Sequence, residues 1–192
     1  MHRSHRRASF SEVLMDDRPA IHRLVELFTG NGKGKTSAAL GTALRAAGQG
    51  LRVHIVYFMK GDYPYGERNA LVRLPNVTMQ SFGHEHFVDP ANVKEEEREQ
   101  ARQALQAGRE AMLSGNADVV VLDEVNLAAA WKLIEVDDVV RLIEEKPDTV
   151  ELILTGRHAD GRLIDMADLV TEMVEVKHPF RKGIEARRGF EY

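Results

Sequence analysis

Hydrophobic residues along the chain gather in short, nearly continuous runs, and segments of helical periodicity separate these runs. The runs predict six β-strands, at 21–28, 51–58, 77–82, 117–122, 150–154 and 169–176. The intervening segments predict helices at 35–47, 92–113, 136–145 and 160–167. The run ADVVVL at 117–122 is almost entirely apolar, which is typical of a parallel strand buried on both faces. The alternation of strands and helices therefore predicts an α/β fold, in which a parallel sheet carries helices on both faces.

Three segments lack either pattern, and one predicted helix carries a capping signal. The first twenty residues are polar and basic, which predicts a flexible or helical N-terminal arm (1–20) before a single domain (21–192). Residues 59–75 contain two glycines and two prolines without a clear period, so they predict a long loop of the kind that often carries function. The segment 177–192 is polar and punctuated by glycines. Asn92, with Glu95 three residues later, predicts a capping box at the start of the longest helix.

The composition narrows the class of protein. A formal charge of −4 argues against general nucleic-acid binding. No apolar run approaches the roughly 18–20 residues of a membrane span, and the N-terminus lacks the apolar stretch of a signal peptide, so we expect a cytoplasmic protein without a membrane partner. The chain has no cysteine, which excludes disulfides, thiolate metal sites, iron–sulfur clusters and a cysteine nucleophile. Any metal must be bound through oxygen or imidazole.

The strongest chemical signal is TGNGKGKT at 29–36, between a predicted strand and a predicted helix. Glycines allow backbone N–H groups to surround phosphate oxygens, and the helix presents its N-terminus to the same anion. Lys35 supplies a positive charge to the phosphates, and the Thr36 hydroxyl can bind Mg²⁺. The usual pattern has glycine where this chain has Thr29, but the strand–loop–helix context is intact. The segment predicts a P-loop, with an ordinary glycine-rich turn as the alternative.

Two further signals follow predicted strands. Asp123 and Glu124 come directly after VVVL, where a carboxylate in a doubly wound sheet lies beside the phosphate loop and can hold Mg²⁺. A solvated acidic pair at a strand end is the alternative. Arg157, in the sequence Thr155-Gly156-Arg157, could pair with phosphate, although a helix N-cap followed by a surface arginine fits the same residues. Together these signals predict an α/β domain that binds a magnesium nucleotide.

Longer strings then show a resemblance to a known family. GNGKGKT at 30–36, FMKG at 58–61 and GERN at 66–69 resemble the ATP:corrinoid adenosyltransferases of cobalamin synthesis. VVLDE at 120–124, LTGR at 154–157 and a set of C-terminal positions agree: Val176, Lys177, His178, Phe180, Gly183, Ala186, Gly189 and Tyr192. The resemblance runs in order over roughly residues 24 to 192.

The resemblance implies a RecA-like P-loop NTPase fold and a homodimer that binds ATP and Mg²⁺. It further implies that the 5′-deoxyadenosyl group of ATP is transferred to the Co(I) of a reduced corrinoid, with release of triphosphate. An electron-donating flavoprotein is an implied partner. A general base is not required, because reduced cobalt is already a strong nucleophile.

The resemblance also assigns residues to roles. Lys35, Thr36 and Glu124 form the expected catalytic set, and Mg²⁺ is assigned to Thr36 and Glu124, with Asp123 as the second choice. The nucleotide is assigned to Gly30, Asn31, Gly32, Lys33, Gly34, Lys35, Thr36, Ser37 and Arg157. The corrinoid-facing set is Glu67, Arg68, Asn69, His84, His86 and Phe87. A plain surface arginine is the alternative for Arg68.

One departure from the family concerns the corrinoid. Familiar bacterial members carry Phe-x-Trp after the segment that corresponds to 79–83, and this motif packs over the corrin and helps to remove the lower axial ligand. Here the chain reads GHEHF at 83–87, and its only tryptophan, Trp131, lies elsewhere. Either Phe87 or a histidine replaces the motif, or residues 84–86 form a solvated loop. The lower-ligand mechanism and the preferred corrinoid stay open.

Two rival functions remain at this point. One is a different P-loop enzyme, an ATPase or a nucleoside kinase, although kinases of the thymidine type on a related sheet usually carry a cysteine zinc ribbon and this chain has no cysteine. The other is a non-enzymatic nucleotide-binding module that contacts nucleic acid through Arg3, Arg6 and Arg7, against which the acidic remainder argues.

Overall fold

Six parallel strands form the centre of the protein. The computed structural model describes residues 22–84 and 86–192, so the predicted arm at 1–20 lies outside the described residues. The strands are β1 (Val25–Thr29), β2 (Val53–Tyr57), β3 (Val77–Ser81), β4 (Val119–Asp123), β5 (Glu151–Thr155) and β6 (Leu169–Glu172). They form one sheet in the order β3-β2-β4-β5-β1-β6. All five pairings are parallel, which confirms the predicted α/β fold.

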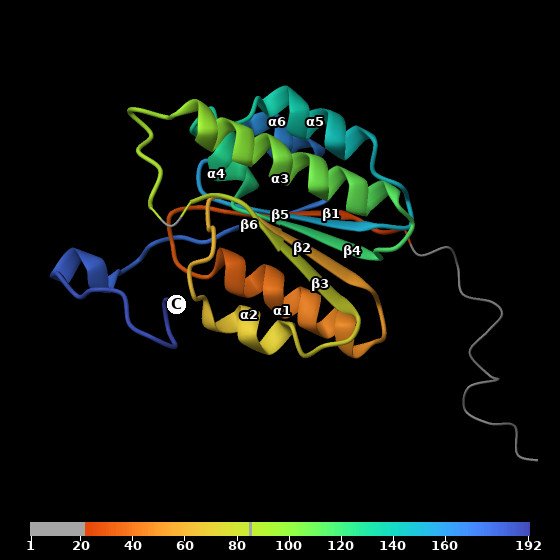
Figure 1. The fold of residues 1–192 in the computed structure, drawn as a ribbon, viewed down its shortest axis with the longest axis horizontal. Coiled ribbons are helices and arrows are strands. Elements are labelled where there is room, and N and C mark those ends of the chain that lie inside the picture. Colours follow the sequence, from red (N-terminus) through yellow and green to blue (C-terminus); the bar gives the residue numbers. More distant parts are fainter. Residues whose placement is uncertain (1–21, 85) are drawn as a thin grey trace, which may run out of the picture.

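Helices cover both faces of this sheet, as the sequence predicts (Figure 1). One face carries α1 (Lys35–Gly48) and α2 (Gly66–Leu71). The opposite face carries α3 (Glu95–Leu113), α4 (Val125–Ala130), α5 (Val136–Glu144) and α6 (Gly161–Met166). A short 3₁₀ helix, η1 (Pro179–Lys182), lies in the C-terminal segment. None of the helices among residues 22–84 and 86–192 is long and apolar enough to cross a membrane.

The predicted capping box at Asn92 is wrong, because that residue belongs to a turn before α3. The backbone N–H groups of Ala91 and Asn92 bond to the side chain and carbonyl of Asp89, both at 3.0 Å. The helix begins three residues later, and the buried Glu97 carboxylate accepts a 2.7 Å hydrogen bond from the Lys94 N–H. A capping interaction is therefore present at the start of α3, but it involves Lys94 and Glu97, because the turn at Asp89 delays the start of the helix.

Alternation along the strands builds two apolar layers. In β4, Val120 and Leu122 pack toward α3 and α5, whereas Val119 and Val121 pack toward α1. Both sets are buried, which explains why this stretch of sequence is continuously apolar. The central strand β4 is thus covered on both faces of the sheet.

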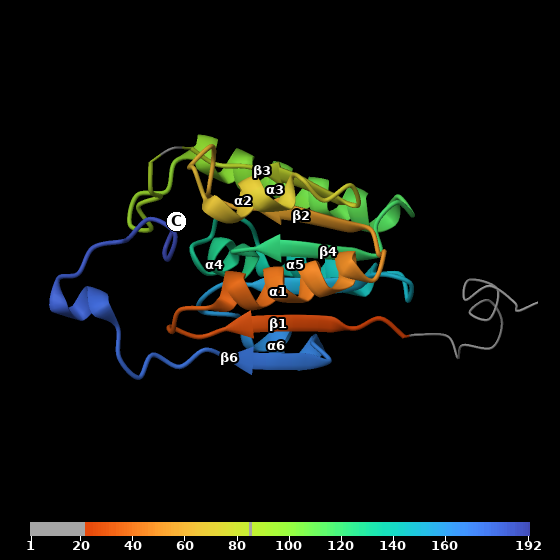
Figure 2. The same cartoon turned by 90° about the horizontal axis from the view of Figure 1, so that it is seen from below.

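The strand order determines what meets at the carboxyl edge of the sheet. β5 lies between β1, which leads into the phosphate loop, and β4, which ends at Asp123. The end of β5, Thr155, consequently lies between those two functional segments. The C-terminal segment after β6 crosses this same edge (Figure 2).

At the opposite, amino edge of the sheet, Asp118 joins β2 to β4. Its carboxylate accepts hydrogen bonds from the Arg52 backbone N–H at 2.9 Å and from the Arg52 guanidinium at 3.0 and 3.1 Å. Arg23 adds a second ion pair at 3.5 Å. These contacts, led by the Arg52 side chain, lower the pKa of Asp118 from 3.8 to about 2.

Replacing this carboxylate should reduce stability in a pH-dependent way. Because the pKa of Asp118 is lowered in the folded state, its contribution is complete above about pH 4 and is lost as pH falls toward 2. Asp118→Asn should therefore be modestly less stable than the parent protein at pH 7, and the difference should shrink near pH 2.5. Urea unfolding of both proteins across this range measures the difference, and a gap that does not change with pH would contradict the assignment.

Candidate functional site

The phosphate loop connects β1 to α1 and depends on its glycines. Gly34, the N-cap of α1, has φ 121°, and Gly30 has φ 93°, conformations that residues with a Cβ rarely adopt. A Cβ at Gly30 would also lie 2.5 Å from the Met173 carbonyl oxygen, too close for any side chain. The Gly32 N–H donates a 2.6 Å hydrogen bond to that same carbonyl. The loop is therefore held tightly against the segment that follows β6.

Lys35 directs its ammonium group into the loop. Its Nζ donates to the carbonyls of Gly30 and Gly32 at 2.9 and 2.8 Å, and the residue is 7% exposed. Burial lowers the pKa of Lys35 because it disfavours the charged form, while Glu124 acts in the opposite direction. The ammonium is thus positioned where phosphate oxygens would compete with the two carbonyls for its protons.

Asp123 is the centre of the hydrogen-bond network at the carboxyl edge. It is fully buried, and its Oδ1 accepts hydrogen bonds from the hydroxyls of Thr36 at 2.9 Å and Thr155 at 2.7 Å. Thr155 also accepts a 2.9 Å hydrogen bond from the Glu124 N–H. Three segments that are distant in sequence are thereby connected through one carboxylate. The structure thus brings Thr36 together with Asp123, the second-choice acidic residue of the expected metal set.

Lys60 completes this network, although the sequence analysis assigned it no role. Its Nζ lies 2.5 Å from Asp123 Oδ2 and 4.9 Å from the centre of the Tyr65 ring. Burial disfavours its charge, but the carboxylates of Asp123 and Glu124 outweigh burial and raise the pKa of Lys60. Its place directly after β2, within the FMKG string, is the signal that could have identified it.

Glu124 has an unusual backbone and an unsatisfied side chain. It is the N-cap of α4 with φ 69°, a left-handed conformation that costs a non-glycine residue about 1–2 kcal/mol. Its Oε2 is buried and has no hydrogen-bond partner among the described residues. Burial, with a further contribution from Asp123, raises the pKa of Glu124. A strained backbone and a buried carboxylate oxygen without a hydrogen-bond partner in the described part of the chain, both at Glu124, indicate a ligand-binding site.

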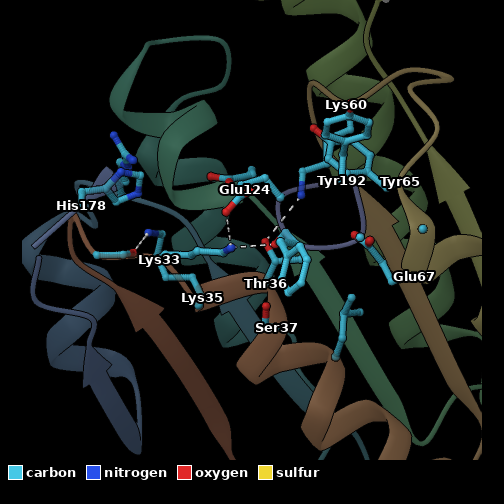
Figure 3. A pocket seen from close by; sticks show the side chains of 18 residues that line it. Lys33, Lys35, Thr36, Ser37, Lys60, Tyr65, Glu67, Glu124, His178 and Tyr192 are labelled. Atoms are coloured by element: carbon cyan, nitrogen blue, oxygen red, sulfur yellow. Dashed lines mark hydrogen bonds and ion pairs between the residues drawn. The ribbon is translucent and has the colours of Figure 1, made fainter. Parts of the chain in front are cut away.

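These residues surround an open cavity of about 710 Å³. The side chains of Lys35, Thr36, Glu124 and Lys60 converge on it, and Tyr65 and Tyr192 lie beside Lys60 (Figure 3). The lining includes Gly32, Lys33, Gly34, Lys35, Thr36, Ser37, Leu40, Lys60, Tyr65, Gly66, Glu67, Glu124, Arg157, His178, Gly189, Phe190, Glu191 and Tyr192. Of the predicted nucleotide-binding residues, Gly30 and Asn31 lie on the loop but not in the cavity wall.

The C-terminal residues form one wall of this cavity, which the sequence did not indicate. Lys33 donates hydrogen bonds to the Phe190 carbonyl at 2.6 Å and to Glu191 Oε1 at 2.8 Å. The Tyr192 ring meets Tyr63 edge-on, with ring centres 5.6 Å apart. Lys33, which the resemblance assigns to the nucleotide, therefore holds the C-terminal segment in this structure.

The predicted corrinoid-facing residues are divided between several surroundings. Glu67 lines the cavity, whereas Arg68 braces the loop behind it by donating to the Gly61 carbonyl at 2.8 Å and to Ser81 at 2.9 Å. Asn69 is exposed outside the cavity wall. His84, His86 and Phe87 also lie outside that wall.

The 84–87 loop has contacts of its own. The rings of His84 and His86 stack with centres 5.1 Å apart, and His86 Nε2 lies 3.4 Å from the Glu97 carboxylate. Phe87 is 90% exposed. Phe87 thus presents an exposed apolar ring outside the cavity wall.

Arg157 lines the cavity, and its guanidinium forms no hydrogen bond or ion pair within the described part of the chain. The N-cap alternative for Thr155 is wrong, because α6 begins at Gly161 and its N-cap is Asp160, whose side chain accepts from the Arg162 N–H. Gly156 is needed where it stands: its φ is 136°, and a Cβ there would lie 2.7 Å from the Leu127 nitrogen.

A family model and several curated relatives all match the same group of proteins. A family model described as "ATP:corrinoid adenosyltransferase BtuR/CobO/CobP" matches residues 22–192. The corrinoid adenosyltransferase of Escherichia coli strain K12 is 37% identical over 169 residues, which cover 88% of this chain and 85% of the relative. Corrinoid adenosyltransferase CobA of Salmonella typhimurium is 36% identical over the same shares. A corrinoid adenosyltransferase of Sinorhizobium sp is 36% identical over 183 residues, 94% of this chain and 86% of the relative.

Removing the Thr155 hydroxyl should weaken both the fold and nucleotide binding. Thr155→Val would leave the Glu124 N–H and one acceptor site of Asp123 unsatisfied, at a cost of about 1–3 kcal/mol in the free energy of unfolding. ATP affinity should fall about tenfold, because both acidic residues lose their alignment. Chemical denaturation and titration calorimetry measure the two effects. Thr155→Ser keeps the hydroxyl and should resemble the parent protein; equal losses in both variants would refute the role.

Proposed function

The chain belongs to the ATP:corrinoid adenosyltransferase family, and we propose that its phosphate loop binds the triphosphate of ATP while the cobalt of a reduced corrinoid attacks the 5′ carbon. Membership of this family carries the activity itself: ATP-dependent transfer of an adenosyl group to a corrinoid. The observation that supports the assignment of the site is the convergence of Lys35, Thr36 and Glu124 on one cavity at the end of the sheet.

The proposed reaction explains why several positively charged side chains line the cavity. A Co–C bond forms at the 5′ carbon, the bond from that carbon to oxygen breaks, and the whole triphosphate leaves with the bond's electron pair. Negative charge therefore grows on the departing oxygen, and fixed positive groups aimed at it lower the barrier. Lys35 and Arg157 line the cavity, and Lys60 lies beside Thr36. No side chain is needed as a general base, so alignment of carbon and cobalt supplies much of the remaining acceleration.

The residues present fit a magnesium ion. The hydroxyl of Thr36 and the carboxylate of Asp123 are 2.9 Å apart, and the Glu124 carboxylate has an oxygen without a partner. Such oxygens are the ligands that Mg²⁺ prefers, usually as one or two carboxylates together with substrate phosphates. When bound, Mg²⁺ would neutralise charge on the triphosphate. We propose Thr36 and Glu124 as its ligands, with Asp123 as the second choice.

For the corrinoid we propose one contact in the cavity wall and one outside it. Glu67 lines the cavity, and we propose that it faces the nucleotide or the corrinoid. We propose Phe87 as an apolar contact for the corrin, supported by its almost complete exposure. A flat, largely apolar macrocycle would cover such a ring and remove it from water.

We also propose that the enzyme acts as a homodimer, receives electrons through a flavoprotein and works in the cytoplasm, where ATP is supplied. The dimer is supported by β6, an edge strand on which Leu169 and Val170 are 40% and 41% exposed. Such apolar edge positions commonly pair with another chain. Light scattering during size-exclusion chromatography measures the oligomeric state.

The activity should be directly observable under anaerobic conditions. Protein, Mg·ATP and chemically reduced cob(I)alamin should convert the Co(I) absorbance to that of a light-sensitive adenosyl product, with inorganic triphosphate as the other product. Lys35→Ala should lower kcat about 10²- to 10³-fold, because one fixed charge facing the leaving group is lost.

The negative outcome is equally informative. ATP binding without Co–C bond formation, with either cobalamin or a cobinamide-type precursor, would overturn the proposed reaction. A matched control is Lys94→Met, which changes an exposed lysine of the α3 N-cap outside the cavity and should leave the rate unchanged.

A further inference from the structure

Two lysines reach the site, and their partners differ. The phosphate-loop lysine, Lys35, bonds to the loop carbonyls and not to Asp123. Lys60, from the connection after β2, lies 2.5 Å from Asp123 Oδ2 and 3.5 Å from the Thr36 hydroxyl. The ammonium of Lys60 is therefore bound by two groups that also suit a magnesium ion.

The ion pair between Lys60 and Asp123 is almost completely shielded from solvent. Asp123 has no exposed side-chain surface, and the Lys60 side chain is 11% exposed. The two threonine hydroxyls both donate to Oδ1, which leaves Oδ2 to the ammonium. An ionised carboxylate buried without a counter-charge is strongly destabilising, so the Asp123 carboxylate depends on a cation beside it.

Lys60 also has a route away from Asp123. It lines the cavity beside Thr36 and Tyr65, and its flexible four-carbon stem lets the ammonium move without rearranging the backbone. The faces of the Tyr65 and Tyr57 rings lie 4.9 and 5.6 Å from the ammonium and attract a cation. Lys60 lines the same cavity as the phosphate loop, in which the triphosphate is proposed to lie.

We propose that Lys60 is an exchangeable counter-cation: it holds Asp123 while the site is empty, and it turns to the triphosphate when Mg²⁺ arrives together with the nucleotide. In the free enzyme it is thus a positioning residue, which keeps Asp123 and Thr36 aligned. In the loaded enzyme it contacts the leaving group. The inference rests on the proposed function, since it assumes a magnesium triphosphate in the cavity.

Thermal unfolding without nucleotide tests the first half. In EDTA, Lys60→Met should lower Tm by about 10 °C, because Asp123 loses the ammonium that forms an ion pair with it. Millimolar Mg²⁺ should restore most of that loss in Lys60→Met, yet change the parent protein little, because Lys60 already occupies the carboxylate. The double variant Lys60→Met/Asp123→Asn should regain stability in EDTA, since a neutral amide needs no counter-charge.

Two results would overturn the proposal. One is a Lys60→Met protein as stable as the parent in EDTA, and the other is a Tm gain with Mg²⁺ that is equal in both proteins. Lys94→Met, the exposed control, should show no shift in either condition. These measurements need no corrinoid, so they stand or fall separately from the adenosyl-transfer assay.

Kinetics at saturating Mg²⁺ test the second half. Lys60→Met should lower kcat about 10²-fold with a smaller change in KM for ATP, because charge on the triphosphate increases in the transition state. Lys60→Arg keeps the charge and should recover part of that loss. A rate equal to the parent's in Lys60→Met, once Mg²⁺ has restored its stability, would show that Lys60 does not act on the leaving group.

Discussion

The buried carboxylate of Asp123 is where the phosphate loop, the central strands and the connection after β2 are joined. Thr36 and Thr155 bind one of its oxygens and Lys60 the other. A charge at this depth is tolerated only when every lone pair facing the protein has a donor, so each of these side chains is constrained by the others. The sheet supplies the geometry, because β5 inserts between β1 and β4 and brings Thr155 to the junction.

Much of the fold could be predicted from the sequence because parallel strands buried on both faces are continuous apolar runs. Among the described residues, the α-helices α2 and α4 were missed, and a helix of six residues gives a 3.6-residue period few positions in which to show. In addition, α4 starts directly after β4 through the left-handed Glu124, without a side-chain cap that a reader of the sequence could recognise. At α3 the sequence did predict a capping interaction, but the turn at Asp89 moves the start of the helix, so Glu97 forms that interaction with the Lys94 N–H.

The site was predictable only where its chemistry is local. The glycines and Lys35 of the phosphate loop form one contiguous string, so spacing alone indicates their purpose. Lys60 meets a partner 63 residues away, and this contact exists because β2 and β4 are neighbours, a pairing that sequence patterns do not reveal. Lys33 and Glu191 likewise form a contact across 158 residues of sequence, which local patterns do not reveal. The roles assigned to the phosphate loop, Glu124 and the corrinoid-facing residues stay predictions.

The C-terminal segment is attached to the phosphate loop at both of its ends. Met173 accepts from the Gly32 N–H at its start, and Glu191 pairs with Lys33 at its finish. Between them Arg181 and Lys182 lie exposed at the end of the 3₁₀ helix η1, and trypsin-like proteases cleave after such basic residues. A single cut there would leave the sheet and its helices untouched while one wall of the cavity stayed only through non-covalent contacts. A preparation nicked in this way would keep the spectroscopic signature of a folded protein, although the hydrogen bonds from Lys33 would then be needed to hold the last residues against the cavity.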